Sequence, residues 1–182
     1  LYKDPGFIQN KKEAAKYFKI AADNGHINSM YKYAMMLDNG DGVPVDKEKA
    51  CFYYKFAADH GQFDSIKKYA HMLFNGVDVP INKKEAARYF KIGALQGDVD
   101  FMNRYATMLT IGDGIQIDKK EGARYYKMAA DSGHSESMFK FAMILSQGDG
   151  IPADQVEASN YFKMGANKGH VDAMFHFAKL IF

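Results

Sequence analysis

Alternating glycine and aspartate residues mark three turns of the sequence, and this combination could bind phosphate or calcium. The first turn is Gly40-Asp41-Gly42, and copies of it lie at 112–114 and 148–150. A phosphate-binding P-loop needs Gly-Lys-Ser/Thr after its glycines, and none follows here. An EF-hand needs acidic residues at alternate positions before its glycine, and Asp38-Asn39-Gly40-Asp41 has a different order. We therefore interpret the glycines as turn residues with a positive φ.

Six histidines and one cysteine are the other candidates for metal binding or nucleophilic chemistry. No His-Glu-x-x-His pattern and no i, i+4 histidine pair occurs among them. His26, His134 and His170 each follow a turn glycine, where the simplest role is to begin a helix. Cys51 occupies a position that holds alanine or serine in the other copies described below, which indicates a small packing site. The sequence thus predicts no catalytic residue, no metal site and no cofactor.

A lysine recurs at a constant interval and could form a basic ridge, which Lys16, Arg88 and Arg124 would extend. One interpretation is a docking site for an acidic surface. The other is an ordinary solvated helix face whose lysine stems cover apolar surface. The lysines of this column are Lys19, Lys55, Lys91, Lys127 and Lys163.

The composition is that of a folded protein, with 47% hydrophobic and 25% charged residues in a chain of 182. The 24 basic and 22 acidic residues balance too evenly to favour nucleic-acid binding. The apolar stretches are short and interrupted, so we expect no membrane-spanning segment, and no signal-peptide pattern is present. A single cysteine excludes an internal disulfide framework and favours a reducing compartment such as the cytoplasm.

All of these residues belong to a repeat with a period of 36 residues. Tyr17-Phe18-Lys19 recurs four times at this step, without insertion or deletion. A glycine follows eight residues after each tyrosine, and an alanine nine residues after that glycine. A fixed period means that each unit docks on its neighbour in the same geometry. The glycines are Gly25, Gly61, Gly97, Gly133 and Gly169, and the alanines are Ala34, Ala70, Ala106, Ala142 and Ala178.

Each repeat is predicted to form two antiparallel helices. Asn10 and Glu13 form a capping box that should begin the first helix, and Gly25 should end it. The second helix should begin near His26 or Asn28. In both helices the apolar residues follow the i, i+3, i+4, i+7 spacing of one helix face.

One such helix pair buries too little surface to fold alone, so the units must stack on one another. We therefore predict an all-α solenoid that forms a single domain over residues 1–182. Its units are 10–45, 46–81, 82–117, 118–153 and an incomplete 154–182, and residues 1–9 are the tail of a preceding repeat. Both ends fall in mid-repeat, so we expect a fragment of a longer array.

The repeat resembles the Sel1-like repeat, a close relative of the tetratricopeptide repeat, over essentially the whole chain. It departs from that pattern at four places, which alter packing details only: Tyr33-Ala34 for the usual Leu-Gly, Leu37 for Tyr, Asp78 for the second turn glycine and Gln116 for the turn proline. The residues that carry the resemblance are Ala14-x-x-Tyr17-Phe18-x-x-Ala21-Ala22-x-x-Gly25, the Ala34 helix and Gly40-x-Gly42-Val43-Pro44-x-Asp46.

The resemblance implies a right-handed α/α superhelix whose second helices line a concave groove. On those helices, one stripe of residues varies between copies beside the constant apolar stripe. Positions that packing does not constrain face solvent, and exposed aromatic residues there are typical anchors for partners. The predicted partner-binding residues are Tyr31, Met35, Asp38, Lys67, His71, Phe74, Asn103, Thr107, Phe139, Met143, Phe175 and Lys179.

These observations favour a non-catalytic scaffold or adaptor that binds a protein or peptide in the groove, and neither nucleic acid nor membrane. The alternative is a structural spacer or self-associating regulatory arm. The apolar end at Leu180-Ile181-Phe182 would allow such end-to-end association. The Lys- and Asn-rich sequence of the repeat resembles versions in some unicellular eukaryotes, where the repeats accompany a protein kinase domain. By that resemblance the regulatory arm would belong to a larger signalling protein.

Overall fold

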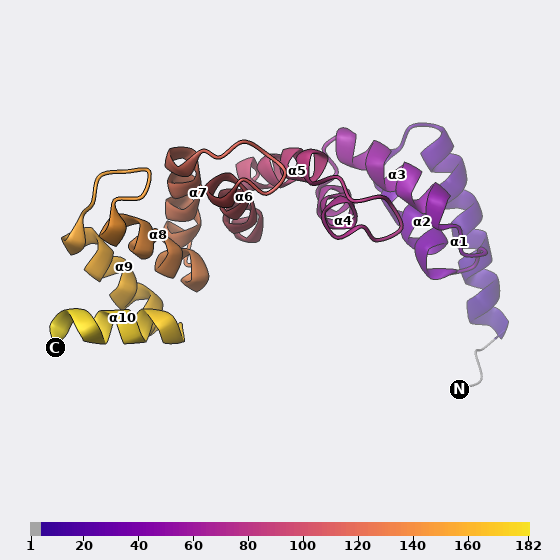
Figure 1. Cartoon of the computed structure of the whole chain (residues 1–182). Helices are drawn as coiled ribbons and strands as arrows, with labels where there is room; N and C mark the ends of the chain where they lie inside the picture. Colours follow the sequence, from indigo (N-terminus) through magenta and orange to yellow (C-terminus); the bar gives the residue numbers. More distant parts are fainter. Residues whose placement is uncertain (1–4) are drawn as a thin grey trace. The chain divides into compact units, whose positions relative to one another are not determined.

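The structure, a computed structural model, describes residues 5–182, with side chains from Asn10 onward (Figure 1). This range contains ten α-helices and no strand, which confirms the predicted all-α fold. None of these helices is both long enough and apolar enough to cross a bilayer. The helices are α1 (Pro5–Asp23), α2 (Ile27–Asn39), α3 (Lys47–Asp59), α4 (Phe63–Asn75), α5 (Lys83–Leu95), α6 (Val99–Ile111), α7 (Lys119–Asp131), α8 (Ser135–Gln147), α9 (Gln155–Asn167) and α10 (Val171–Ile181).

The chain divides into two compact units, Leu1–Tyr89 and Phe90–Phe182. Consecutive helices pack on one another from α1 to α4 in the first unit and from α6 to α10 in the second. Helices α3, α5, α7 and α9 each have 13 residues and begin 36 residues apart, so the helix borders follow the period of the sequence. That the whole array forms a single domain stays a prediction.

The first helix of a repeat begins at an acidic or amide cap, as its sequence predicts. The side chains of Asp46, Asn82, Asp118 and Asp154 each accept a hydrogen bond from the backbone N–H three residues later, at 2.9–3.0 Å. These bonds satisfy amides that have no partner inside the helix.

The predicted cap at Asn10 is wrong, because α1 begins at Pro5 and runs through Asn10 without a break. A proline suits the first helical position, where its missing N–H costs nothing. Ile8 stands where later turns have Pro44 or Pro80, but a missing proline does not by itself extend the helix, since Gln116 replaces it too and Asp118 still caps α7. The first helix, α1, is therefore longer at its N-terminal end than the first helices of the later repeats.

The residue after the turn glycine caps the second helix of a repeat, which confirms the helix-start interpretation of three histidines. The Nδ1 atoms of His26, His134 and His170 accept hydrogen bonds from the backbone N–H three residues later, at 3.2–3.3 Å. Gln62 and Asp98 cap the two remaining copies in the same way. An acceptor is thus retained at this position while its residue type changes.

The core is built from the apolar faces of stacked helices, and one aromatic contact recurs at each junction between repeats. In the first unit the rings of Tyr33 and Tyr53 meet edge to face at 5.3 Å. In the second unit the rings of Tyr105 and Tyr125 do the same at 5.0 Å. Such pairs add about 0.5–1.5 kcal/mol beyond the buried area. Tyr69 with Tyr89 and Phe141 with Tyr161 complete the series.

The turn after the second helix touches the first helix of its own repeat, and this contact explains its second glycine. Gly42 has a φ of +75°, and a Cβ there would lie 2.5 Å from the carbonyl carbon and oxygen of Lys11. An ion pair between Lys11 and Asp41 holds the same junction. In the second unit Gly150 approaches Lys119 closely, and Lys119 pairs with Asp149 at 2.7 Å. The positive φ of Gly42 and Gly150 confirms the turn interpretation, and the close contact with the first helix is a second reason for glycine that the sequence did not indicate.

The turn at residues 76–80 differs from the others in the position of its acidic residue. Val77 replaces the aspartate and Asp78 replaces the second glycine. Asp78 keeps the left-handed conformation, with a φ of +61°, and its carboxylate lies 3.7 Å from the Lys47 amine. Aspartate is one of the few residues that tolerate this conformation. The contact between turn and first helix therefore retains an acid near the lysine although the acid has moved by one position.

We expect Gly42→Ala to lower the free energy of unfolding by about 2–4 kcal/mol, because it adds a backbone clash to the cost of a positive φ. Gly25→Ala is the matched control: Gly25 has a φ of +87° and nothing within 4 Å of the added Cβ. Its expected loss is only about 1–2 kcal/mol. Urea unfolding of both variants measures the difference, and equal losses would mean that the contact with Lys11 contributes nothing.

Candidate interaction surfaces

The lysine column does not form a bare basic ridge where its contacts are described. Lys55 pairs with Asp59 at 2.8 Å one helical turn later, and Lys19 pairs with Asp23 in the same way. Lys127 lies 3.0 Å from Glu157 of the following repeat. These lysines are therefore largely neutralised by neighbouring carboxylates, which agrees better with a solvated face than with a docking site for an acidic partner.

The same aspartates accept hydrogen bonds from tyrosines of the next repeat. The hydroxyl of Tyr53 donates to Asp23 at 2.9 Å, and that of Tyr89 donates to Asp59 at 2.6 Å. In the second unit Tyr161 donates to Asp131 at 2.5 Å. Burial, together with the bond to Asp23, raises the pKa of Tyr53 to about 12. At these three junctions the recurring tyrosine thus links neighbouring repeats through its hydroxyl as well as its ring.

Asp59 is the most heavily bonded carboxylate of this series. Burial opposes its ionisation, but hydrogen bonds from Lys55, Tyr89 and Arg88 outweigh burial and lower the pKa of Asp59 to about 2. A pKa below the unfolded value means that the charged form stabilises the fold. This stabilisation is complete above about pH 4 and is lost as the pH falls toward about 2.

We expect this loss to reach about 1–2 kcal/mol, a value discounted because the Asp59 side chain is 31% exposed. Urea unfolding between about pH 5 and about pH 2 measures it. The variant Asp59→Asn does not titrate at this position, so its stability should fall less steeply over that range. Parallel pH profiles for the two proteins would contradict the assignment.

One junction lacks the link between tyrosine and aspartate. Leu95 stands where the other copies have Asp23, Asp59 and Asp131. The Tyr125 hydroxyl, which would donate to such an aspartate, is buried and has no hydrogen-bond partner among the described residues. Arg124 folds back onto Glu121 at 2.6 and 2.8 Å, whereas its counterpart Arg88 reaches Asp59 at 2.9 Å. A buried unpaired hydroxyl costs about 1–3 kcal/mol.

The predicted partner-binding residues, which we call the variable stripe, are all at least partly accessible. Phe175, 62% exposed, and Lys179 are exposed. The other ten are half-buried: Tyr31, Met35, Asp38, Lys67, His71, Phe74, Asn103, Thr107, Phe139 and Met143. By contrast, the constant stripe beside it is buried in α2, with Met30 and Tyr33 at 6% exposure.

Several residues of the variable stripe are held by contacts within the protein. In the first unit Asp38 lies 2.8 Å from Lys68, also pairs with Lys47, and retains only 9% exposure of its side chain. Burial opposes the ionised form, but the two lysines lower the pKa of Asp38. In the second unit the Thr107 hydroxyl lies 2.8 Å from that of Tyr126. These two side chains therefore offer less to a partner than the sequence suggests.

Aromatic residues and histidines gather on the variable stripe near the end of the second unit. The Phe139 ring stacks on His170 at 4.9 Å, and the exposed Phe175 ring meets His176 edge to face at 5.6 Å. His176 also stacks on Phe162 at 5.2 Å. We call Phe139, His170, Phe175 and His176 the aromatic cluster. Sequence reasoning placed only the two phenylalanines at this surface.

Comparison of the repeat copies could have identified His176 as a surface residue of this cluster. Its position holds a cation in the four preceding copies, and in three of them that cation lies over an aromatic ring of the first helix of the same repeat. Lys68 lies 5.7 Å from the centre of the Tyr54 ring, and Lys140 lies 5.5 Å from that of Tyr126. His176 replaces the cation and keeps the contact by stacking, so comparison of the copies places it beside the groove helices.

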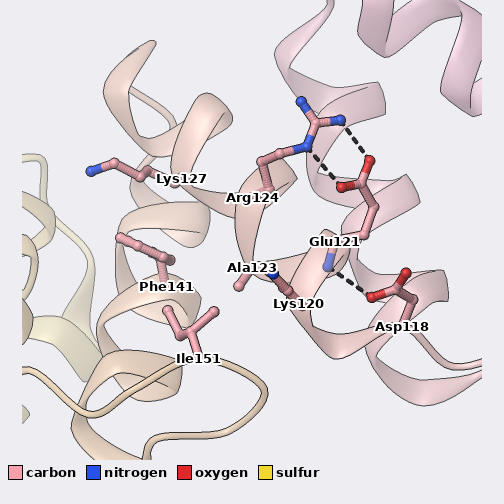
Figure 2. A pocket seen from close by; sticks show the side chains of 8 residues that line it. All are labelled: Asp118, Lys120, Glu121, Ala123, Arg124, Lys127, Phe141 and Ile151. Atoms are coloured by element: carbon pink, nitrogen blue, oxygen red, sulfur yellow. Dashed lines mark hydrogen bonds and ion pairs between the residues drawn. The ribbon is translucent and has the colours of Figure 1, made fainter.

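A recess of about 370 Å³ in the second unit, lined by charged stems and apolar side chains, holds no catalytic pair (Figure 2). Arg124 is bound by both oxygens of Glu121, and Asp118 caps the helix beneath them. Lys127 lies on the opposite side, toward Phe141. Among the described residues, no group of three histidine, cysteine or acidic side chains is placed to bind a metal.

The pattern Ser-x-x-Lys, which some hydrolases use, begins at Ser29, Ser65 and Ser137. All three serines are buried in the first turn of a second helix, at 6%, 0% and 0% exposure respectively. Lys68 and Lys140, which end two of these patterns, lie over aromatic rings instead. The serines are therefore packing residues without access to a substrate.

Comparisons with known proteins agree with this architecture. Residues 2–26, 27–62, 64–98, 99–134 and 135–170 match the Sel1 repeat. A protective antigen of uropathogenic Escherichia coli with an SLR fold has a TM-score of 0.83 at 26% identity, over 93% of this chain and 36% of that one. A Sel1 repeat protein from Oxalobacter formigenes has a TM-score of 0.74 at 24% identity, over 90% of this chain and 67% of that one.

This chain therefore spans only about a third of the first of these structures. A search of curated proteins finds no match. Sel1 repeat proteins generally serve as scaffolds for protein interactions and are generally non-catalytic. The repeat matches cover most of the sequence and confirm the predicted repeat solenoid, so the chain belongs to the Sel1 repeat family.

Proposed function

We propose that this chain binds a partner protein or peptide through its variable stripe and catalyses no reaction. The observation that carries the proposal is the aromatic cluster of the second unit, where Phe175 is 62% exposed beside His176. Large aromatic side chains in partly desolvated surroundings supply much of the binding energy of protein interfaces.

The contrast between constant and variable positions supports this assignment. Position 139 holds phenylalanine, and its counterparts are Tyr31, Lys67, Asn103 and Phe175. The fold therefore accepts tyrosine, lysine or asparagine at this position as well as phenylalanine. An aromatic residue that packing does not require, and that stays accessible, is available for recognition.

The variant Phe175→Asn tests the proposal, since asparagine already occupies the equivalent position at Asn103. Both proteins are immobilised, and proteins captured from a lysate of the source organism are compared by quantitative mass spectrometry. We expect recovery of the main partner to fall about tenfold, the loss typical of one aromatic anchor. Melting temperatures should be nearly equal, because Phe175 is mostly exposed.

Met164→Asn is the matched control, because Met164 is 41% exposed but lies on a first helix, α9, away from the variable stripe. It should leave recovery of the partner unchanged. Phe139→Ala is a second variant, read together with its melting temperature because this ring is half-buried. Unchanged recovery with both phenylalanine variants would overturn the assignment of the variable stripe.

Self-association through α10 is a second candidate. This helix exposes Val171 at 74%, Met174 at 45%, Leu180 at 48% and Ile181 at 69%. In a longer array a following repeat would pack on this apolar helix, and for this chain a second copy would take that place. Static light scattering over a range of concentrations tests it against Val171→Asp, and a monomer mass at every concentration would exclude it.

A further inference from the structure

The exposed face of α3 differs in kind from the same face of the other first helices. Four residues, one helical turn apart, form what we call the acidic–aromatic stripe: Glu48, Phe52, Phe56 and His60. Phe52 is 62% exposed and Phe56 38%, and both end residues are exposed as well. Two exposed phenylalanines in line on a helix of a folded protein need an explanation.

Packing within the fold does not supply one. The equivalents of Glu48 are lysine in α1, α5 and α7, and those of Phe52 are lysine or arginine in the same three helices. The repeat therefore folds with two cations where α3 has an acid and a phenylalanine. The corresponding residues are Lys12, Lys16 and Ile20 in α1, Lys84, Arg88 and Ile92 in α5, Lys120, Arg124 and Met128 in α7, and Val156, Asn160 and Met164 in α9.

The rings of the stripe form an ordered surface. The Phe56 and His60 rings are stacked, with centres 4.3 Å apart and planes 18° apart, and the Phe52 ring follows 6.4 Å away. His60 Nδ1 donates a hydrogen bond to the Phe56 carbonyl at 2.7 Å, since a carbonyl can only accept. This bond fixes the histidine against the end of α3, so three flat rings stand side by side.

The acidic end of the stripe borders a recess of about 360 Å³, lined by Asp46, Glu48, Lys49 and Phe52. The cations nearby are neutralised, because Lys49 pairs with Asp46 at 2.7 Å and Lys55 pairs with Asp59 at 2.8 Å. Glu48 makes no ion pair within the described residues. A carboxylate without a partner beside an exposed ring face is complementary to a cation.

We propose that the acidic–aromatic stripe binds a basic segment of a partner protein, in which an arginine meets Glu48 and Phe52 and an apolar side chain meets Phe56. Arginine fits better than lysine because its planar guanidinium stacks on a ring and pairs with both oxygens of a carboxylate. This surface lies on a first helix, uses no residue of the variable stripe and does not depend on the function proposed above.

Two labelled peptides test the proposal: a short alanine-based helical peptide with one arginine and, four residues later, one leucine, and its twin with glutamate in place of the arginine. Fluorescence anisotropy measures their binding to the whole chain. The arginine peptide should bind about tenfold more tightly than its twin. Phe52→Arg should weaken binding of the arginine peptide about tenfold, and Glu48→Lys should reverse the preference.

Both substitutions introduce residues that the repeat already carries at these positions, so both variants should fold with nearly unchanged melting temperatures. Lys120→Ala, at the position of α7 equivalent to Glu48, is the control and should not alter binding. Equal binding of the two peptides, or binding insensitive to both variants, would overturn the proposal. A dimer in sedimentation velocity that Phe52→Arg dissociates would overturn it too, because a second copy would then occupy the stripe.

Discussion

Gly93→Ala is expected to lower the free energy of unfolding by about 2 kcal/mol, although alanine normally stabilises a helix by about 1 kcal/mol over glycine. The added Cβ would lie 1.9 Å from Cδ2 and 2.6 Å from Cε2 of Phe101. Phe101 is 1% exposed and meets Phe90 edge to face at 5.0 Å, so it has little room to move. Overpacking therefore outweighs helix propensity.

Other repeats have a larger residue at the position of Gly93 and a smaller one at the position of Phe101. Ala57 stands opposite Ser65, and Ala129 opposite Ser137, where repeat three has Gly93 and Phe101. The double variant Gly93→Ala with Phe101→Ser restores that common pair. Phe101→Ser alone should cost about 3–5 kcal/mol through the cavity it leaves.

We expect the double variant to be about 2 kcal/mol more stable than the sum of the two single changes predicts. Chemical unfolding of the four proteins in the cycle measures this coupling. Gly165→Ala is the control for a milder contact, because its Cβ would lie 3.0 Å from that of Ala173. Additive losses in the cycle would mean that Gly93 and Phe101 do not share one space.

Tyr89→Phe and Tyr125→Phe should have different effects although both side chains are 0% exposed. Tyr89 gives up a hydrogen bond to a charged carboxylate, Asp59, which costs about 1.5–3 kcal/mol. Tyr125 gives up a hydroxyl without a partner, so its replacement should be neutral or slightly stabilising. Thermal and urea unfolding of both variants measure the difference.

The variant Leu95→Asp tests whether Tyr125 lacks a hydrogen bond because leucine replaces aspartate at position 95. Leu95 is 65% exposed, so losing its side chain costs little, and aspartate would offer an acceptor to the Tyr125 hydroxyl and to Arg124. We expect a gain of about 1 kcal/mol. In this background Tyr125→Phe should become destabilising. If the two tyrosine variants behave alike with leucine at position 95, the explanation is wrong.

The sequence predicted the parts of the fold that depend on one repeat at a time. Asp46 and Asp118 cap their helices and Gly40 ends one, because caps and turn glycines act on adjacent backbone. The Asn10 cap was wrong, because α1 begins at Pro5, where a proline suits the first helical position, and runs through Asn10. The periodic tyrosines were recognised as part of the repeat, whereas their bonds to aspartates of the neighbouring repeat depend on how two repeats are placed.

The candidate surfaces were predicted less completely. Variation between copies identified Phe139 and Phe175 as accessible, but it also included Asp38, whose ion pairs bury most of its side chain. Variation also occurs on the first helices, where Phe52 replaces a cation. A stripe of that kind is found by comparing charge and ring content between copies, in addition to asking which positions vary.

The unpaired hydroxyl of Tyr125 indicates where the repeat array begins to unfold. In linear arrays, cooperativity depends on the coupling between adjacent modules, so the weakest coupling decides where a partly unfolded form opens first. Amide hydrogen exchange should accordingly be fastest, among the buried segments of the second unit, around Tyr125 in α7, and Leu95→Asp should slow it there.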